Sequence, residues 1–551
     1  MTGDVVMDVS TDGAVNAPTS DSVSITVDNV GTSGGIFVSG TLAIDTTSGG
    51  GASDGLTTAG SVLLQATDGQ LIAGFLDVAA RASESGRSFS FNGTGQDFQG
   101  GDVTLRAGAN GLIDLGFAFI DTDATGAVNS AGDATGGSIT LEANDGAIRL
   151  QSFTYLNATA RGGSGIDPVD GGAAFAQGGD ITVSLSGPGG SMDLGDAFFT
   201  ADASILFDVE GGSVDFSGDG GSAAAGDVTF NLSGGTLTAN FMSITSQGTG
   251  GIGGTLPPGV AAFSTGLPSA GNGGSGQGGG IIFNLNGTDV TIGDLTILAD
   301  GIGGDGAFGR FTDGTRAGSG GDAVGGTVVF NALSGTLNAA SITVAARGNG
   351  INGGGRGGDA AGSEGGNGGN ATGGSATFNL NGATIASSGD ILVSTEAFGG
   401  RGGDSFATID NFSNTLVSQA AGSGGNGTGG AATFNNTSGV IGFTSLTASA
   451  AGIGGDGGTS RGLSTNDSAG AGGIGGNGLG GIATINLNQD DASNPNYRVD
   501  ASATGGVGGG GLFSGNGGDA AGGTANLAIN NSDVSFTSAV ITVDAQGGNV
   551  G

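Results

Sequence analysis

Large apolar residues recur along this chain at a fixed place in a repeated phrase. The phrase is a glycine pair, three further residues and a large apolar residue, as in GGSITL ending at Leu141, GGTVVF at Phe330 and GGSATF at Phe378. Ten copies, one with Ala in place of the first glycine, follow one another at intervals of 36 to 56 residues. A repeat of this length indicates a solenoid, in which stacked units bury a core that no single unit can bury.

Each unit predicts two or three short strands. Apolar and polar residues alternate with a period of two inside the apolar clusters, which is the pattern of a half-buried strand. A second apolar residue follows the first by seven positions, as Leu337 follows Phe330, and a further cluster lies around Ile342. A turn pair such as Ser334-Gly335 separates the first two clusters.

The rest of each unit is a glycine-rich insertion that lengthens toward the C-terminus, as in residues 301–326 and 397–430. Because the length varies at one point only, the core repeat tolerates loops there. We therefore predict an all-β fold, a right-handed parallel β-helix (β-solenoid) of about ten to twelve coils with long glycine-rich loops inserted at one point of each coil. Two ladders are expected, of the phrase phenylalanines and of the asparagines after them: Phe230, Phe283, Phe330, Phe378 and Phe434, and Asn231, Asn284, Asn331, Asn379 and Asn435.

The regularity of the repeat divides the chain into three regions. We expect less regular coils in residues 1–98, compact coils in 99–249, and coils with long Gly/Asp-rich loops in 250–551. The opening MTGDVVMDVS lacks the basic and apolar regions of a signal peptide, and the end SAVITVDAQGGNVG has no cap. We therefore expect a segment of a longer chain.

Composition excludes several kinds of chemistry. Of 551 residues 129 are Gly, and there is no Cys, His or Trp, so no thiolate nucleophile, Ser-His pair or His/Cys metal site can form. All 12 basic residues are Arg, against 49 acidic ones, which gives a formal charge of −37. Such a surface repels nucleic acid. No apolar run approaches the ~20 residues of a membrane-spanning helix.

The runs GGSATFNLNGATIASSGDILVSTEAFGG and GGTVVFNALSGTLNAASITVAARGNG resemble bacterial surface adhesins, the filamentous-haemagglutinin-like and autotransporter-passenger β-helices. The resemblance extends over nearly the whole chain. It implies a non-enzymatic structural or adhesive rod at the bacterial cell surface, outside the cell, that presents glycine-rich loops to a host or neighbouring cell, a glycan or matrix. We also expect self-association along the rod. The alternatives are a polysaccharide-processing β-helix enzyme and a calcium- or ice-binding solenoid.

The loops carry the motif G-x-G-G-D six times. Asp carboxylates and backbone carbonyls at glycine turns suit a hard cation such as calcium, and GGRGGDSFA at 399–407 resembles the nonapeptide of calcium-binding RTX repeats. The alternative is that each Asp shapes a turn beside Gly. If the loops stack, a carboxylate column would form along one edge. The candidate calcium ligands are Asp305, Asp322, Asp359, Asp404, Asp456 and Asp519.

The same loops resemble the GGNGG tracts of mycobacterial PGRS proteins, most closely in residues 505–523. Ordering one backbone residue costs about 1–2 kcal/mol, and these loops have few side chains to offset that cost. Either they are mobile, or successive loops pair through their backbones as polyglycine-II or strand stacks. Recurrence at the same point of every coil favours stacking.

Three further hypotheses concern side chains on the coils. A two-carboxylate hydrolase needs a positioned acid and base with sugar-binding aromatic residues. The candidate carboxylates are the adjacent pair Asp490-Asp491 and the pair Asp121 and Asp123, which are two residues apart. We interpret both pairs as solvated turn carboxylates, because a chain with two Tyr and no Trp has few aromatic residues to hold a sugar. An ice-binding surface would need a regular Thr array, and the strand Thr positions are irregular. The loop arginines are expected to pair with neighbouring Asp rather than bind an anionic glycan: Arg310, Arg316, Arg347, Arg356, Arg401 and Arg461.

Overall fold

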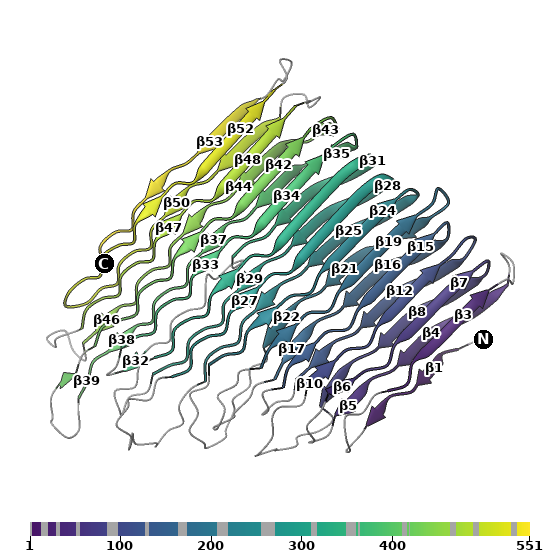
Figure 1. The fold of residues 1–551 in the computed structure, drawn as a ribbon, viewed down its shortest axis with the longest axis horizontal. Helices are drawn as coiled ribbons and strands as arrows, with labels where there is room; N and C mark the ends of the chain where they lie inside the picture. The colour runs from purple at the N-terminus through teal and green to yellow at the C-terminus, as the bar shows by residue number, and fades with distance from the viewer. Residues whose placement is uncertain are drawn as a thin grey trace.

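A computed structural model describes most of the chain as strands and turns. The described residues are 3–12, 20–28, 34–50, 56–84, 97–126, 132–163, 174–205, 219–254, 270–309, 317–348, 360–361, 364–409, 416–417, 419–462, 470–488, 495–530 and 537–551. None of these residues is helical. Strands of successive units lie side by side and parallel, from the N-terminal strands to the C-terminal ones (Figure 1). The prediction of an all-β parallel solenoid is confirmed at this level.

Each coil is flat and has two faces. A strand of the first face leads to a hairpin turn and a strand of the second face leads back from it. In the described residues the first face has twelve strands: β3 (Val23–Asp28), β7 (Val62–Thr67), β11 (Val103–Ala107), β15 (Ile139–Asn144), β19 (Ile181–Ser186), β24 (Val228–Ser233), the opening halves of β28 (Gly280–Leu298) and β31 (Thr327–Ala345), β34 (Ser375–Leu380), β42 (Ala431–Asn436), β48 (Ile482–Leu487) and β52 (Thr524–Ile529).

The second face lies opposite the first and is formed by later strands of the same coils. It consists of β1 (Val5–Asp8), β4 (Gly35–Asp45), β8 (Gln70–Ala79), β12 (Leu112–Asp121), β16 (Ala147–Asn157), β20 (Ser191–Asp193), β21 (Asp196–Thr200), β25 (Thr236–Thr245), the closing halves of β28 and β31, β35 (Thr384–Ser387), β36 (Asp390–Ser394), β43 (Val440–Gly442), β44 (Ser445–Ser449), β49 (Asn496–Asp500) and β53 (Ser538–Thr542). Because β28 and β31 run through both faces, all these strands form one 26-stranded sheet. Strands from all three regions expected from the sequence belong to this one sheet.

Two arms extend each coil beyond its faces. The outgoing arm follows the second face and the return arm precedes the first face of the next coil. Short parallel strands pair the outgoing arms: β2 (Thr11–Asp12), β5 (Ser48–Gly50), β9 (Ala82–Glu84), β13 (Ala124–Thr125), β17 (Ala160–Gly162), β22 (Ala203–Ile205), β26 (Gly248–Thr249), β29 (Gly301–Ile302), then β37 (Ala397–Phe398), β45 (Gly452–Ile453), β50 (Ala503–Thr504) and β54 (Ala545–Gln546).

The return arms pair in the same way. Their strands are β6 (Leu56–Thr58), β10 (Asp97–Gln99), β14 (Ala134–Thr135), β18 (Ala176–Gln177), β23 (Ala223–Ala224), β27 (Gly276–Gln277), β30 (Ala323–Val324), β33 (Ala371–Thr372), β41 (Gly427–Thr428), β47 (Gly478–Leu479) and β51 (Ala520–Ala521). Farther out lie a parallel set, β32 (Ala360–Ala361), β38 (Ser405–Phe406) and β46 (Ser460–Arg461), and one antiparallel pair, β39 (Thr408–Ile409) with β40 (Leu416–Val417).

The core lies between the two faces. Its centre is the predicted phenylalanine ladder, in which the rings from Phe230 to Phe434 are fully buried and successive ring centres lie 5.1, 4.8, 4.4 and 5.1 Å apart. The predicted asparagine ladder is also confirmed on the outer side of the first face. Each Nδ2 donates to the Oδ1 of the previous coil over 2.8–3.0 Å, from Asn284 to Asn231 and onward to Asn486.

The two faces converge away from the hairpin turns, so each coil is a wedge. Packed sheets lie about 10 Å apart, but at the end of the core the two chain segments bond directly: Gly326 N–H donates to Ala299 O over 2.7 Å. The same bond recurs in eleven coils of the described structure. We call this place the neck. Its donor is the second glycine of the repeated phrase, and a Cβ on Gly326 would lie 2.0 Å from Gly279 O. The phrase therefore requires glycine because backbones meet there.

Beyond the neck the arms hold each other by backbone bonds. In one outgoing arm, Gly454 N–H donates to Thr504 O of the next coil and Gly455 N–H to Gly425 O of the return arm, both over 2.8 Å, while Asp456 faces solvent. This three-residue alternation is that of a polyglycine-II stack. A Cβ on Gly455 would lie 2.0 Å from a carbonyl oxygen of the neighbouring coil. The stacking expected for these segments is confirmed in the described arms, which run as wavy lines across the lower left of Figure 1.

Candidate functional site

The aspartates of the G-x-G-G-D motif lie on two different arms. Asp305, Asp404 and Asp456 belong to outgoing arms, whereas Asp322 and Asp519 belong to return arms. Asp359 lies outside the described residues. The column expected along one edge would be formed on the outgoing arms, where Asp305, Asp404 and Asp456 are its described members.

The neighbours of these aspartates on each arm are mostly not carboxylates. Arg401 lies beside Asp456, and Asp404 lies beside Thr459 one triplet farther out. Asp305 is three coils before Asp456, which is about 14 Å at strand spacing. On the return arm, Asp322 and Asp519 are the two ends of a column whose middle members are asparagines: Asn370, Asn426 and Asn477.

Motif aspartates of both arms take part in a chain of side-chain-to-backbone bonds. Asp456 Oδ1 accepts the N–H of Val507, one coil later, over 2.8 Å, and Asp322 Oδ1 accepts the N–H of Asn370 over 2.8 Å. Asn477 Oδ1 accepts the N–H of Asp519 in the same way (2.8 Å). Each carboxylate or amide thus satisfies an outward N–H that the arms cannot pair among themselves.

Asp404 has an additional partner. Its carboxylate accepts the N–H of Thr459 over 2.8 Å and an Arg401 N–H over 2.7 Å, with Arg461 3.8 Å away. Within the described residues no three acidic side chains gather into a group that could hold a metal ion. Calcium at these positions stays a prediction.

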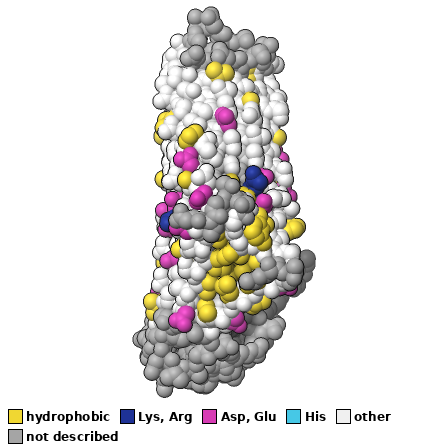
Figure 2. Space-filling view, turned by 90° about the vertical axis from the view of Figure 1, so that its right-hand side faces the viewer, with side chains coloured by type: hydrophobic (Ala, Val, Ile, Leu, Met, Phe, Trp, Pro, Cys, Tyr) yellow, Lys and Arg dark blue, Asp and Glu magenta, His cyan; other side chains and the backbone are white. Residues whose placement is uncertain are grey.

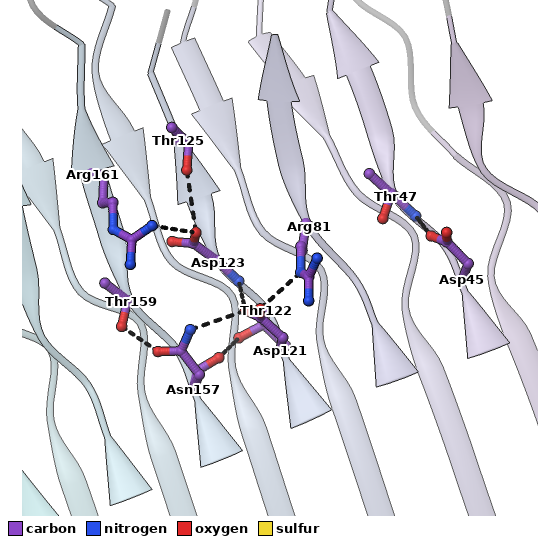
Figure 3. Close-up of polar contacts among 10 residues, drawn as sticks. All are labelled: Asp45, Thr47, Arg81, Asp121, Thr122, Asp123, Thr125, Asn157, Thr159 and Arg161. Atoms are coloured by element: carbon purple, nitrogen blue, oxygen red, sulfur yellow. Dashed lines mark hydrogen bonds and ion pairs between the residues drawn. The ribbon is translucent and has the colours of Figure 1, made fainter. Parts of the chain in front are cut away.

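A row of buried polar side chains follows the end of the second face. We call it the polar row; it consists of outward-facing residues where the strands pass into the outgoing arms, and in the first coils it includes Arg81, Asp121, Asp123, Asn157 and Thr159 (Figure 3). Asp121 and Asp123 are only 7% and 8% exposed. The expectation that they are solvated turn carboxylates is wrong, because the change of direction at the neck encloses them.

The contacts in the polar row join three coils (Figure 3). Asp121 Oδ2 accepts Arg81 Nε–H over 2.7 Å, and its Oδ1 accepts the amide of Asn157 over 3.1 Å and the N–H of Asp123 over 3.0 Å. Asp123 Oδ2 lies 3.7 Å from Arg161 Nη1. Among the described side chains, Asp123 Oδ1 is one of three buried oxygens without a hydrogen-bond partner.

Burial sets the protonation of two members of the row. It raises the pKa of Asp123 to about 7, an effect that Arg161 opposes and the Asp121 charge reinforces. Burial likewise raises the pKa of Asp202, two coils farther on, to about 6, against a hydrogen bond from Gln247 N–H. Both carboxyls therefore change charge near neutral pH.

The arginines of the described chain are largely engaged in ion pairs. Arg347 pairs with Asp300 of the polar row over 2.7 Å, and Arg401 and Arg461 with Asp404, as expected for these three. Arg498 pairs with Asp500 over 2.7 Å. Arg310, Arg316 and Arg356 lie outside the described residues.

Seven aromatic rings form a strip on the outer side of the second face, next to the polar row. The neighbours of these rings in sequence, such as Leu76, Ala118 and Leu156, point into the core. Phe117 and Phe153 are 46% and 37% exposed. This aromatic strip consists of Phe75, Phe117, Phe119, Phe153, Tyr155, Phe198 and Phe241, in five consecutive coils.

Sequence reasoning missed this strip, because it followed only the phenylalanines of the repeated phrase. The rings point outward because of a bulge in the middle of β12: Ile113 and Leu115 are inward, whereas after Gly116 the inward residues are Ala118 and Ile120. The alternation changes phase there, so Phe117 and Phe119 point outward. A glycine inside a strand pattern signals such a bulge. Of the two tyrosines considered for sugar binding, Tyr155 is in the strip and Tyr497 is in the core.

The fold and its side chains define a parallel β-solenoid with a buried polar row, an outer aromatic strip and glycine arms. No protein-family model, curated protein or solved structure matches the chain. The described residues contain no helix long and apolar enough to cross a membrane. The acidic pair Asp490-Asp491 lies outside the described residues.

Proposed function

We propose that this chain is a non-enzymatic structural and adhesive rod segment of an exported bacterial cell-surface protein. In this proposal the solenoid is a right-handed parallel β-helix, it lies outside the cell, and its glycine-rich loops are presented to a host or neighbouring cell, a glycan or matrix. Self-association along the rod belongs to the same proposal.

One observation carries the proposal: coil-to-coil bonding is continuous across the width of the coil. Parallel strands join the faces, a bond in every neck joins the two segments of a coil, and polyglycine-II contacts join the arms. A stack bonded at every level bends little, because each coil is fixed to its neighbours at several separated places. A stiff elongated scaffold supports presentation of loops at a distance from a cell.

Two measurements test this function. Protease added to intact cells of the source bacterium should digest the protein if it lies on the surface, whereas a cytoplasmic control protein should survive. Beads coated with the purified chain should then adhere to cells or matrix more than beads coated with an acidic, non-repeat protein. Protection from protease, or equal adhesion of both kinds of bead, would contradict the proposal.

A specific observation favours a second candidate, a polysaccharide-processing enzyme. Asp123, with its raised pKa, lies beside Asp121, and carboxyls whose environments differ in this way serve as acid and base in hydrolases. Release of reducing sugars from a polysaccharide, abolished by Asp123→Asn and by Asp121→Asn but not by Asp456→Asn, would establish that activity. If no reducing sugars are released from any polysaccharide that the chain binds, the enzyme candidate is refuted.

A further inference from the structure

We propose that the aromatic strip binds a neutral polysaccharide chain that lies along the rod axis. This inference rests on the adhesive function proposed above and names the site and the chemical class of its ligand. The strip occupies the outer side of β8, β12, β16, β21 and β25, and the polar row begins two residues farther along the same strands.

The rings of the strip pack differently from those of the core. The rings of the phenylalanine ladder from Phe230 to Phe434 stack with interplanar angles of 7–25°, and each fills the space above the next. In the strip, only Phe119 and Tyr155 of the described pairs stack, at 18°; Phe75 and Phe117 are tilted by 36° with centres 6.2 Å apart, and Phe153 and Phe198 by 38° at 5.4 Å. Tilted rings leave part of each ring open to solvent. An apolar surface of this kind on a soluble protein indicates an interaction site.

The charges around the strip decide against an anionic ligand. Asp77 and Asp196 occupy the same two rows as the aromatic rings, in place of a ring. Asp114 lies on β12 before Phe117, and its neighbour on β16 is Arg149, so the two opposite charges lie side by side there. The arginines of the neighbouring polar row are paired with its buried carboxylates. The side view also shows acidic side chains at many places and basic ones at few (Figure 2). With a total charge of −37, a uronate or a sulfated glycan would be repelled.

The groups beside the rings match a carbohydrate. The C–H faces of a sugar ring are apolar and pack on aromatic rings, while hydroxyl groups at its edge bond to carboxylates, amides and hydroxyls. The strip carries such groups: the Tyr155 hydroxyl, whose pKa is raised by burial, and the carboxylates of Asp77 and Asp196, which occupy its two rows.

The direction of the strip indicates that its ligand is a polymer. Its rings continue through five coils, which lie about 4.8 Å apart, and they run along the rod rather than across it. A single sugar would contact only part of this surface. A chain of several sugar units along the axis would contact all of it, which is why we choose a polysaccharide rather than a monosaccharide.

Calorimetric titration with a defined panel tests the inference. The probes are cellohexaose, laminarihexaose, mannohexaose and chitohexaose, with hexagalacturonic acid as the anionic comparison. At least one neutral probe is expected to bind, and its affinity is expected to fall by about tenfold or more in a Phe117→Ala/Phe153→Ala variant. Phe308→Ala is the matched control, since Phe308 is 59% exposed and belongs to an arm.

Each outcome decides between the strip and the wider proposal. Binding of no neutral probe, equal affinity of the double variant, or preference for the galacturonate overturns the inference. So does loss of a concentration-dependent dimer in the double variant, which would identify the strip as a self-association surface. If coated beads still adhere with the double variant, the strip is not the adhesive site and the adhesive function stands. If wild-type beads do not adhere, the adhesive function itself fails.

Discussion

At the level of single residues, the neck glycines show why this chain has so much glycine. Most glycines of the necks and arms do not adopt the left-handed region that usually explains glycine; among the described residues that region is used at hairpin turns, as by Gly335 with φ 96°. The others are required because a carbonyl oxygen of a neighbouring coil or of the opposite arm occupies the place of a Cβ. Glycine here permits close contact between backbones.

Replacing a neck glycine should therefore be costly. In Gly326→Ala the new Cβ would meet Gly279 O at 2.0 Å, so the neck must open and its bond to Ala299 O is lost. We expect a loss of about 1–3 kcal/mol or more, measured as a lower melting temperature. Gly442→Ala is the control, because no atom lies within 4 Å of the position of its Cβ. Equal melting of the two variants would refute the steric explanation.

The buried Asp202 predicts a dependence of stability on pH. Its pKa is raised from 3.8 to about 6 because burial disfavours the charged form. The folded state then binds the proton more tightly than the unfolded state, so stability is full below pH 3.8 and declines as pH rises through 6. Asp202→Asn stays neutral and keeps an acceptor for Gln247 N–H. Its melting temperature should exceed that of the wild type at pH 8 and approach it at pH 4; a constant difference would contradict the burial effect.

At the level of elements, the strands could be read from the sequence and the arms only in part. The phenylalanine and asparagine ladders follow from a repeat whose register is visible, because the position of Phe330 in its unit fixes what lies above it. Stacking of the glycine segments was expected, but not the role of Asp456. Its partner, Val507 N–H, is one coil away, and the interval between coils varies. A local motif cannot identify a contact of that kind.

The arm aspartates should be replaceable by asparagine and not by alanine. Asp456→Ala leaves the N–H of Val507 without its acceptor, and because that site is exposed we expect a cost of about 0.5–1.5 kcal/mol. Asp456→Asn keeps an acceptor oxygen, as Asn426 does for Asn477 in the return arm. Hydrogen–deuterium exchange at Val507 should be faster in the alanine variant alone. Faster exchange in both variants would show that the charge, rather than the bond, protects this amide.

At the scale of the whole molecule, the wedge-shaped coil explains how one chain combines a core of packed side chains between its faces with backbone-to-backbone packing in its arms. Within the core the faces are separated by large side chains such as Phe378, at the neck by Ala, Ser and Thr, and where the arms begin by alanines such as Ala124 and Ala160, whereas farther out along the arms backbone meets backbone. This gradation from large to small residues recurs along the described coils, so each coil stacks on the next although the arms differ in length. The bulge at Gly116 and the enclosure of Asp121 belong to this three-dimensional shape, which the one-dimensional pattern does not contain.

The same scale governs how the molecule responds to ions. A charge of −37 on one chain is self-repelling, and dissolved salt screens exposed charges beyond a Debye length of about 10 Å at 0.1 M. Sodium chloride is therefore expected to raise the melting temperature. The calcium site predicted at the motif aspartates adds a second expectation: calcium chloride at matched ionic strength should raise the melting temperature further than sodium chloride does. The measurement is thermal melting in both salts and in chelator. A larger rise in calcium that disappears in an Asp305→Asn/Asp404→Asn/Asp456→Asn variant would establish a metal site on the outgoing arms, and equal melting in the two salts would refute it.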